Sequence, residues 1–235
     1  MRAALAATLL LAAAPAAAQD CRLALALAID VSSSVDAQED ALQRNGLAAA
    51  LLAPEVQSAF FAAPQPVALA VYEWSGRFNQ ALVVDWQEID SPLALAAVAA
   101  TIRGSQRSQT QYPTALGYAL GYGATLLTRA PPCARQTLDV AGDGENNDGF
   151  GPRHAYAAFP FDGVTVNGLV VDIAEDEAQV ALFDFYRDEV LRGPGAFLEI
   201  ARGFSDYETA MRRKLEREVM PRMTSEDARP RPGNG

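Results

Sequence analysis

The sequence predicts an α/β fold, in which a doubly wound, mostly parallel six-stranded sheet carries helices on both faces. Short apolar runs alternate along the chain with stretches of helical periodicity, which is the pattern of such a sheet. The first run, at residues 23–31, is almost unbroken, as in a strand covered on both faces. Residues 114–128 repeat their apolar side chains at helical spacing. No internal repeat or linker divides the sequence, so one domain is expected.

Helix and strand signals in the first half define five elements. Asp36, with Glu39 three residues later, has the pattern of a capped helix start. That helix should run to about residue 53, where Pro54 interrupts it. The other expected elements of this half are strands at 67–74 and 81–86, joined as a hairpin through Gly76, a helix at 91–102 and a loop at 104–111.

The second half continues the alternation of helices and strands. Pro113 fits the first turn of the helix at 114–128, and Pro131-Pro132 ends it. The remaining expected elements are strands at 136–141, 164–173 and 197–201, a loop at 142–149, and helices at 178–191 and 205–220. On the last helix Tyr207, Met211 and Leu215 share one stripe.

The N-terminus has the composition of a secretory signal peptide. Arg2 precedes an apolar run at residues 3–11, and Pro15 leads to an Ala-x-Ala end at 16–18. That run is short for a membrane span, so cleavage after Ala18 is expected, with a retained anchor helix as the alternative. We therefore expect a signal peptide at 1–18, a folded domain at 19–223, and a disordered Pro/Arg/Gly-rich tail at 224–235. The mature protein would be periplasmic or secreted.

The net charge argues against two classes of partner. The whole chain has a formal charge of −10, which becomes −11 when Arg2 leaves with the signal peptide. Such a protein repels nucleic acid and anionic lipid over most of its surface. Nucleic acid is therefore not an expected partner, whereas a cation fits the charge. No membrane span is expected after cleavage, because no other segment is apolar for long enough to cross a bilayer.

The two cysteines, Cys21 and Cys133, are expected to form a disulfide. Cys21 precedes Asp30 by nine residues, and Cys133 precedes Asp143 by ten. If both Asp residues end neighbouring parallel strands, both cysteines lie together at the opposite strand ends. An even cysteine count in an exported protein favours the disulfide over two free buried thiols.

Five oxygen-bearing side chains in three separated segments are candidate metal ligands. They are Asp30, Ser32 and Ser34 in AIDVSSSVD, Thr114 in YPTALGYAL, and Asp143 in LDVAGDGENN. Ligands bind such sheets outside the carboxyl ends of the strands, where Asp30 and Asp143 are expected. Oxygen ligands without Cys or His suit a hard divalent cation: Mg²⁺ first, with Mn²⁺ or Ca²⁺ as alternatives. The competing interpretation of Asp30 and the serines is a loop that caps the next helix.

This arrangement resembles the von Willebrand factor type A domain and its metal-ion-dependent adhesion site. The matching residues are Asp30, Ser32 and Ser34 of the DxSxS motif, Thr114 of the second loop, and Asp143-Gly144 of the third. The resemblance covers residues 23–220, and LALAIDVSSSVD, VYEWSG and LDVAGDGENNDG are similar to a family of secreted bacterial A-domain proteins without assigned function. It implies direct metal contacts from both serines, and direct or water-mediated contacts from Thr114 and the acids. Gly142 departs from it, because many relatives carry Thr or Ser there, and the lost hydroxyl would weaken the site.

Other motifs that could indicate a binding or catalytic site have simpler structural explanations. Residues 143–149 are similar to a calcium loop, but His154 stands where an EF-hand needs Glu, so turn formation is preferred. The acids at 172 and 175–177 are interpreted as a solvated helix start. His154 is the only histidine and no G-x-S-x-G is present, which argues against a catalytic triad or a zinc site. The only lysine, Lys214, lies in the last helix, which excludes a phosphate-binding loop.

We therefore predict a binding module rather than an enzyme. Its metal would capture an acidic side chain of a protein partner, whose Asp or Glu completes the coordination. Tyr112 is the aromatic residue beside the site that should be exposed enough to contact a ligand. One alternative is a metal-dependent hydrolase with Asp172, Glu145 or His154 as a remote general base. The other is a metal-free scaffold domain.

Overall fold

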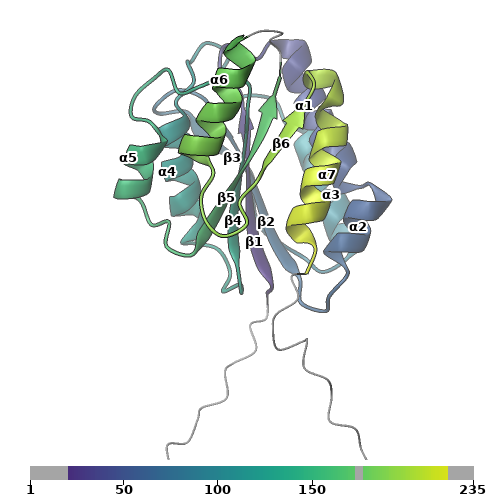
Figure 1. Ribbon diagram of the computed structural model, residues 1–235. Coiled ribbons are helices and arrows are strands. Elements are labelled where there is room, and N and C mark those ends of the chain that lie inside the picture. Colours follow the sequence, from purple (N-terminus) through teal and green to yellow (C-terminus); the bar gives the residue numbers. More distant parts are fainter. Residues whose placement is uncertain (1–20, 173–176, 222–235) are drawn as a thin grey trace, which may run out of the picture.

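The computed structural model describes residues 21–172 and 177–221, and a six-stranded sheet forms its centre. The strand order is β3-β2-β1-β4-β5-β6, and all neighbours are parallel except β2 and β3. The strands are β1 (Leu23–Asp30), β2 (Val67–Trp74), β3 (Gln80–Ile89), β4 (Gln136–Gly142), β5 (Val164–Val171) and β6 (Leu198–Ala201). The predicted fold class and the predicted hairpin are both confirmed (Figure 1).

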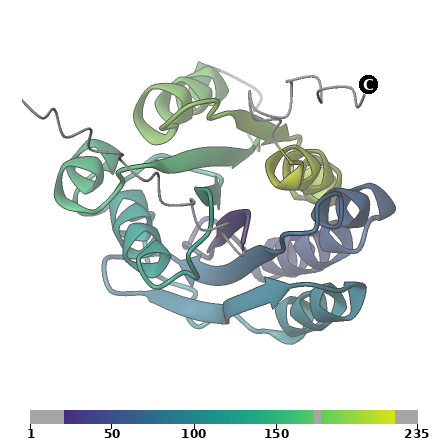
Figure 2. The same cartoon turned by 90° about the horizontal axis from the view of Figure 1, so that it is seen from below.

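Helices cover both faces of this sheet (Figures 1 and 2). One face carries α1 (Ala37–Leu51), α2 (Pro54–Phe60), α3 (Pro92–Gly104) and α7 (Tyr207–Val219). The other carries α4 (Leu116–Leu127), α5 (Pro152–Ala158) and α6 (Glu177–Phe185). Two buried apolar clusters result, one on each side of the sheet.

The central strand β1 is buried along its whole length, and its two faces carry different side chains. Leu23, Leu25 and Leu27 belong to the cluster under α1 and α7, whereas Ala24, Ala26 and Ala28 belong to the cluster under α4. Alternate side chains of a strand point to opposite faces, so LALALA builds a bulky layer on one side and a thin layer on the other.

Two short helices were not predicted, and both begin with proline. The first helix, expected to run to about residue 53, ends at Leu51, and Pro54 instead starts α2; Pro152 likewise starts α5. Proline interrupts a helix from the inside yet fits its first turn, where its missing N–H has no intrahelical acceptor. The capping box of α1 is present as predicted, with Asp36 accepting from the N–H groups of Gln38 and Glu39.

Several expected boundaries shift by a few residues. The helix expected from residue 114 begins at Leu116, and the strand expected to residue 173 ends at Val171. The helix expected at 178–191 is α6 followed by a π-helical turn, η1 (Tyr186–Val190). The closing helix is preceded by a 3₁₀ turn, η2 (Phe204–Asp206). Residue 173, the expected signal peptide and the expected tail lie outside the described residues.

The disulfide between Cys21 and Cys133 is present, with a Cα–Cα distance of 4.4 Å. It joins the start of β1 to the segment before β4, which pairs with β1 in parallel. The two cysteines therefore meet at the strand ends opposite Asp30, as the similar spacings of nine and ten residues predict. Among the described residues, no helix is long and apolar enough to span a membrane.

Helix α7 is attached to the sheet by the predicted apolar stripe and by buried charges. Tyr207, Met211 and Leu215 are all buried against the sheet. Lys214 is fully buried beside them, with its Nζ 2.9 Å from Asp139 Oδ1 of β4 and 2.7 Å from Glu218 Oε1. The only lysine of the chain is thus an interior residue, whose ion pair with Asp139 connects the last helix to a central strand of the sheet.

Candidate metal centre

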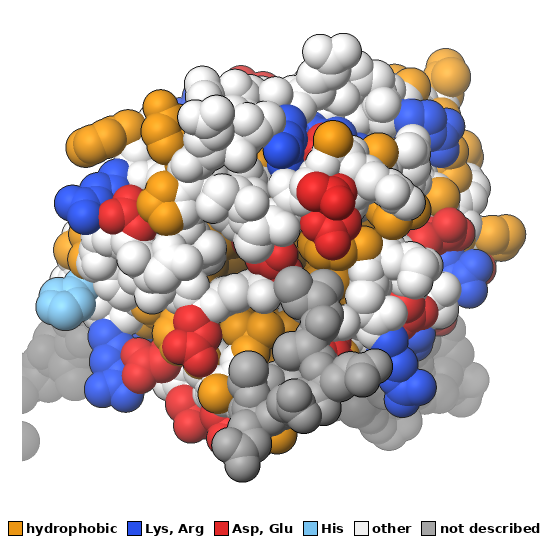
Figure 3. Space-filling view, turned by 90° about the horizontal axis from the view of Figure 1, so that it is seen from above, with side chains coloured by type: hydrophobic (Ala, Val, Ile, Leu, Met, Phe, Trp, Pro, Cys, Tyr) orange, Lys and Arg blue, Asp and Glu red, His pale blue; other side chains and the backbone are white. Residues whose placement is uncertain are grey.

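Three loops meet at the carboxyl end of the parallel strands. The first follows β1, the second precedes α4 and the third follows β4; β1 and β4 are neighbours in the sheet. The Ser33 N–H donates to the Tyr112 carbonyl at 2.8 Å, which joins the first loop to the second. Figure 3 shows this end of the molecule, where acidic side chains lie near a depression in the middle.

Four of the five predicted ligands form one chain of contacts. Asp30 Oδ1 accepts from the Ser32 N–H at 2.7 Å, and the hydroxyls of Ser32 and Ser34 lie 3.0 Å apart. Ser34 Oγ then donates to Asp143 Oδ1 at 2.7 Å. Asp30, Ser32 and Asp143 are buried, whereas Ser34 is exposed. The site therefore has a buried floor and one side open to solvent.

Thr114 reaches the same place through the third loop. Its carbonyl accepts from the N–H groups of Asn147 and Asp148, and its own N–H donates to Asn147 Oδ1 at 2.9 Å. A Cβ added to Gly144 would lie 3.8 Å from Thr114 Oγ1, so this hydroxyl faces the residue next to Asp143. The structure thus brings all five predicted residues to one edge of the sheet.

Two asparagines that the sequence reasoning assigned only to a turn hold this edge together. Asn147 binds the backbone of Thr114, and Asn146 Oδ1 accepts from the Gly117 N–H at 3.1 Å. The α4 N-cap, Ala115, has no side-chain hydrogen bond of its own, so Asn146 supplies one to the first turn. Asp148 pairs with Arg77 at 2.7 Å. With these side chains engaged, turn formation explains residues 143–149 better than a calcium loop. The signal in the sequence was the Asn-Asn pair beside Asp143.

Each of the two carboxylates, Asp30 and Asp143, has one buried oxygen that no hydrogen-bond donor among the described residues satisfies. These oxygens are Asp30 Oδ2 and Asp143 Oδ2. Burial first, and then the neighbouring Asp143, raise the pKa of Asp30 to about 8. Burial also raises the pKa of Asp143, against the hydrogen bond from Ser34, which lowers it. Unpartnered buried carboxylate oxygens beside hydroxyls are a donor set that fits a hard divalent cation.

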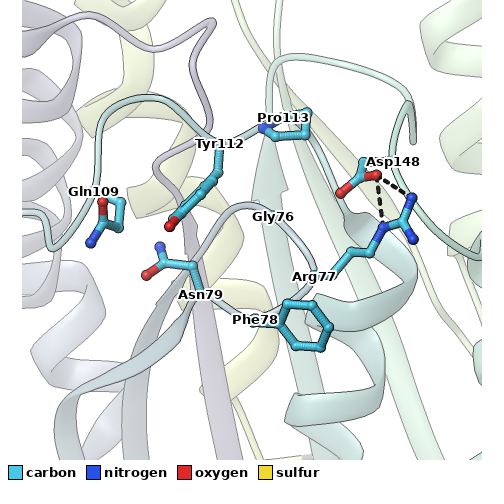
Figure 4. Close-up of a pocket in the computed structure, with 8 residues that line it drawn as sticks. All are labelled: Gly76, Arg77, Phe78, Asn79, Gln109, Tyr112, Pro113 and Asp148. Atoms are coloured by element: carbon cyan, nitrogen blue, oxygen red, sulfur yellow. Dashed lines mark hydrogen bonds and ion pairs between the residues drawn. The ribbon is translucent and has the colours of Figure 1, made fainter.

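A pocket of about 360 Å³ lies directly beside this edge (Figure 4). Its walls are the turn between β2 and β3 and the second loop, with Gly76, Arg77, Phe78, Asn79, Gln109, Tyr112, Pro113 and Asp148 as its lining. Phe78 is 94% exposed and Tyr112 is 45% exposed. Tyr112 is therefore accessible, as expected, and Phe78 is a second accessible aromatic residue that the sequence reasoning did not single out.

The groups considered as remote bases do not join this chain of contacts. His154 lies on α5 and lines a different pocket with Arg153 and Glu189. Glu145 is exposed in the third loop, and Asp172 lines a pocket with Ile200 and Arg202 beyond β5. Among the described residues, no group of three or more His, Cys, Asp or Glu side chains forms a metal-binding cluster. The candidate centre has two carboxylates, and its other three candidate ligands are hydroxyl groups.

Comparison with known proteins establishes the fold and a family. Residues 20–223 match the model of a family described as "Protein of unknown function (DUF1194)". None of the curated proteins matches the chain in sequence. Among solved structures, proximal thread matrix protein 1 from the mussel byssus is 14% identical, with 86% of this chain covering 48% of that chain and a TM-score of 0.61.

Two further structures have the same fold. The pilus adhesin SpaC from Lactobacillus rhamnosus GG is 13% identical, with 85% of this chain covering 31% of that chain and a TM-score of 0.62. A von Willebrand factor type A protein from Catenulispora acidiphila is 14% identical, with 85% covering 43% and a TM-score of 0.60. The chain spans less than half of the length of each of these three structures. At such identities the likeness establishes the A-domain fold.

Proposed function

The chain belongs to the DUF1194 family, whose description assigns no activity. We propose that it is an exported A-domain that binds a protein partner through a divalent cation. Asp30, Ser32, Ser34, Thr114 and Asp143 would hold the cation. The observation that carries this proposal is the contact chain from Asp30 to Asp143, with two buried carboxylate oxygens that lack a partner. Mg²⁺ is the expected ion, with Mn²⁺ or Ca²⁺ as alternatives.

The ligand set determines what the bound cation would do. Three of the five residues are neutral hydroxyls, so the protein would offset the charge of the cation only in part. The cation would supply an electrophilic position for an outside carboxylate. Asp30 and Asp143 would orient the hydroxyls, and the solvent-exposed side at Ser34 would admit the Asp or Glu of the partner.

Three observations support binding at this site outside the cytoplasm. One related structure, of proximal thread matrix protein 1, is described as having a zinc-occupied MIDAS motif; it is 16% identical, with 86% of this chain covering 47% of that chain and a TM-score of 0.57. Another related structure is a pilus adhesin. The disulfide between Cys21 and Cys133 is typical of an oxidising compartment.

The pocket beside the metal edge supports contact with more than one residue of the partner. Tyr112 forms its wall and also binds the first loop through its carbonyl, so pocket and metal site share one segment. A partner bound at the metal edge would therefore have its neighbouring residues beside the pocket that Tyr112 and Phe78 line. Exposed aromatic residues next to a polar site are typical anchors of interfaces.

Thermal unfolding of the mature protein with and without metal tests the proposal. Metal at a hundredfold excess over its dissociation constant should stabilise the fold by about 2.7 kcal/mol. For a domain of this size the melting temperature should rise by roughly 5–10 °C. The rise should disappear in Asp30→Ala and Ser32→Ala. It should persist in Ser33→Ala, a matched control, because Ser33 lies exposed in the same loop and only its backbone bonds the second loop.

Partner capture needs a second measurement. Immobilised peptides that each carry one Asp, beside the same peptides with Asn, should retain the protein in Mg²⁺ and release it in EDTA. No melting-temperature rise with millimolar Mg²⁺, Mn²⁺ or Ca²⁺ would refute the metal site. A rise without any preference for Asp over Asn would refute carboxylate capture and leave a structural metal.

A further inference from the structure

Gly142, the residue before Asp143, has no side chain, and the hydroxyl of another element fills the space beside it. A Cβ added to Gly142 would lie 2.5 Å from the Tyr186 hydroxyl and 3.1 Å from Asp30 Oδ2. The hydroxyl of Tyr186 and this oxygen of Asp30 therefore both lie near the position that a Cβ of residue 142 would occupy. Tyr186 comes from η1, far along the chain from both metal-site loops.

Two glycines make room for this tyrosine. A Cβ added to Gly168 of β5 would lie 2.9 Å from Tyr186 Cδ1, so any side chain there would collide with the ring. Gly168 pairs with Val140 of β4, and Gly142 lies two residues further along β4. The ring thus crosses the sheet over Gly168 and carries its hydroxyl to the end of β4, where Gly142 leaves it space. Tyr186 is fully buried in this position.

Both polar atoms lack a partner. Tyr186 OH and Asp30 Oδ2 are buried without a hydrogen bond to any described residue. The two atoms are not hydrogen-bonded to each other in this structure. A buried polar atom without a partner is costly, so a donor and an acceptor that lie near the same point need only a small shift to satisfy each other. A phenol donates one hydrogen and a carboxylate oxygen accepts it. Trp74 Nε1 is a further unpartnered donor nearby, but the Trp74 atom closest to this point is the carbon Cζ2, at 3.4 Å.

We propose that Tyr186 is a positioning residue of the metal site, whose hydroxyl is the buried donor that a small shift brings onto Asp30 Oδ2. Asp30 Oδ1 already accepts from the Ser32 N–H, so a second bond on Oδ2 fixes the plane of the carboxylate toward the serines. Groups that orient metal ligands typically change metal affinity 10–100-fold when they are removed. This inference rests on the proposed metal site and names a residue that makes it effective.

Tyr186→Phe removes one oxygen and keeps the ring, so it tests the role of the hydroxyl alone. Mn²⁺ titration, followed by electron paramagnetic resonance of the free ion, should give a dissociation constant about tenfold higher than that of the wild type. The matched control is Tyr156→Phe. Tyr156 packs against the same apolar cluster as Tyr186, on the α4 side of the sheet, but its hydroxyl donates to the Val190 carbonyl. Tyr156→Phe should lower the melting temperature and leave Mn²⁺ affinity unchanged.

Rescue separates the hydroxyl from general packing. In the Tyr186→Phe background the space beside position 142 is free, so Gly142→Ser should return a hydroxyl to Asp30 and restore most of the affinity. In the wild-type background the same Gly142→Ser would clash with Tyr186 and lower the melting temperature.

Each outcome decides between the two proposals. Wild-type Mn²⁺ affinity in Tyr186→Phe, or a weakened affinity that Gly142→Ser does not restore, overturns the role of Tyr186 and leaves the metal site standing. Absence of Mn²⁺ binding by the wild type overturns the metal site and, with it, this inference.

Discussion

Asp139→Asn is expected to remove one contribution to the pH dependence of the unfolding free energy. Asp139, Lys214 and Glu218 form a buried cluster with two carboxyl groups and one ammonium group, exposed by 1%, 0% and 4%. Glu218 Oε1 accepts from Lys214 and also from Asn167 Nδ2 at 2.6 Å. With Lys214 charged, the cluster is neutral if one of its two carboxyl groups keeps its proton. Burial first, and then Glu218, raise the pKa of Asp139 to about 8, although Lys214 lowers it.

The size of the effect follows from this pKa. An unfolded Asp titrates near 3.9, so between about pH 4 and pH 8 the folded protein holds one proton more than the unfolded chain. The stabilisation from this proton is complete below pH 4 and is lost as the pH rises through 8. The slope is about 1.4 kcal/mol of unfolding free energy per pH unit. From pH 5 to pH 7 this group alone should lower the stability by roughly 2.7 kcal/mol.

Urea unfolding at pH 5, 6 and 7 in EDTA measures this difference. An amide in place of a protonated carboxyl keeps the shape and does not titrate, so Asp139→Asn should lose roughly 2.7 kcal/mol less than the wild type across this range. Other groups, including Asp30 and Asp143, titrate in both proteins and cancel in the comparison. Parallel pH curves for the two proteins would refute the assignment of the proton to Asp139.

Three other substitutions test separate features. Lys214→Met leaves Asp139 and Glu218 buried without a cation and should cost about 3–5 kcal/mol in urea unfolding; a loss below 1 kcal/mol would contradict the buried cluster. The double variant Cys21→Ser/Cys133→Ser opens a disulfide across 112 residues and should lose about 4–5 kcal/mol in the chain-entropy model, while dithiothreitol should destabilise the wild type alone. Phe78→Ser should keep the melting temperature and weaken Mg²⁺-dependent retention on Asp peptides about tenfold. Leu93→Ser is its control, because Leu93 is 79% exposed on α3 outside the pocket lining, and equal weakening in both variants would argue against the pocket.

Strand ends carried most of the information that the sequence held about the candidate site. Asp30 and Asp143 end or follow apolar runs, and parallel strands bring such ends to one edge. The same reasoning placed Cys21 and Cys133 together at the other edge, where the disulfide lies. Both inferences need only the strand direction and the count of residues along each strand. Errors were confined to the boundaries of helices and strands, to the turns η1 and η2, and to the short helices α2 and α5, which begin with proline.

The partners of individual side chains could not be read in this way. The sequence places Lys214 only in the last helix, whereas its position over β4 makes it an internal cation. No sequence pattern singles out Phe78, and only its 94% exposure in the pocket that Tyr112 also lines makes it a candidate contact for a ligand. Such properties depend on which elements pack over a residue, and no local pattern encodes them.

The sequence by itself determined the α/β class, the hairpin, the disulfide and the convergence of five oxygen-bearing side chains, because each follows from periodicity and from residues at strand ends. Only the tertiary structure decided that Gly142 and Gly168 leave space for Tyr186, and that the Tyr186 hydroxyl and Asp30 Oδ2 both lie beside Gly142. The physical reason is steric: a glycine in a sequence is only a missing side chain until the fold determines which atom occupies the space it leaves.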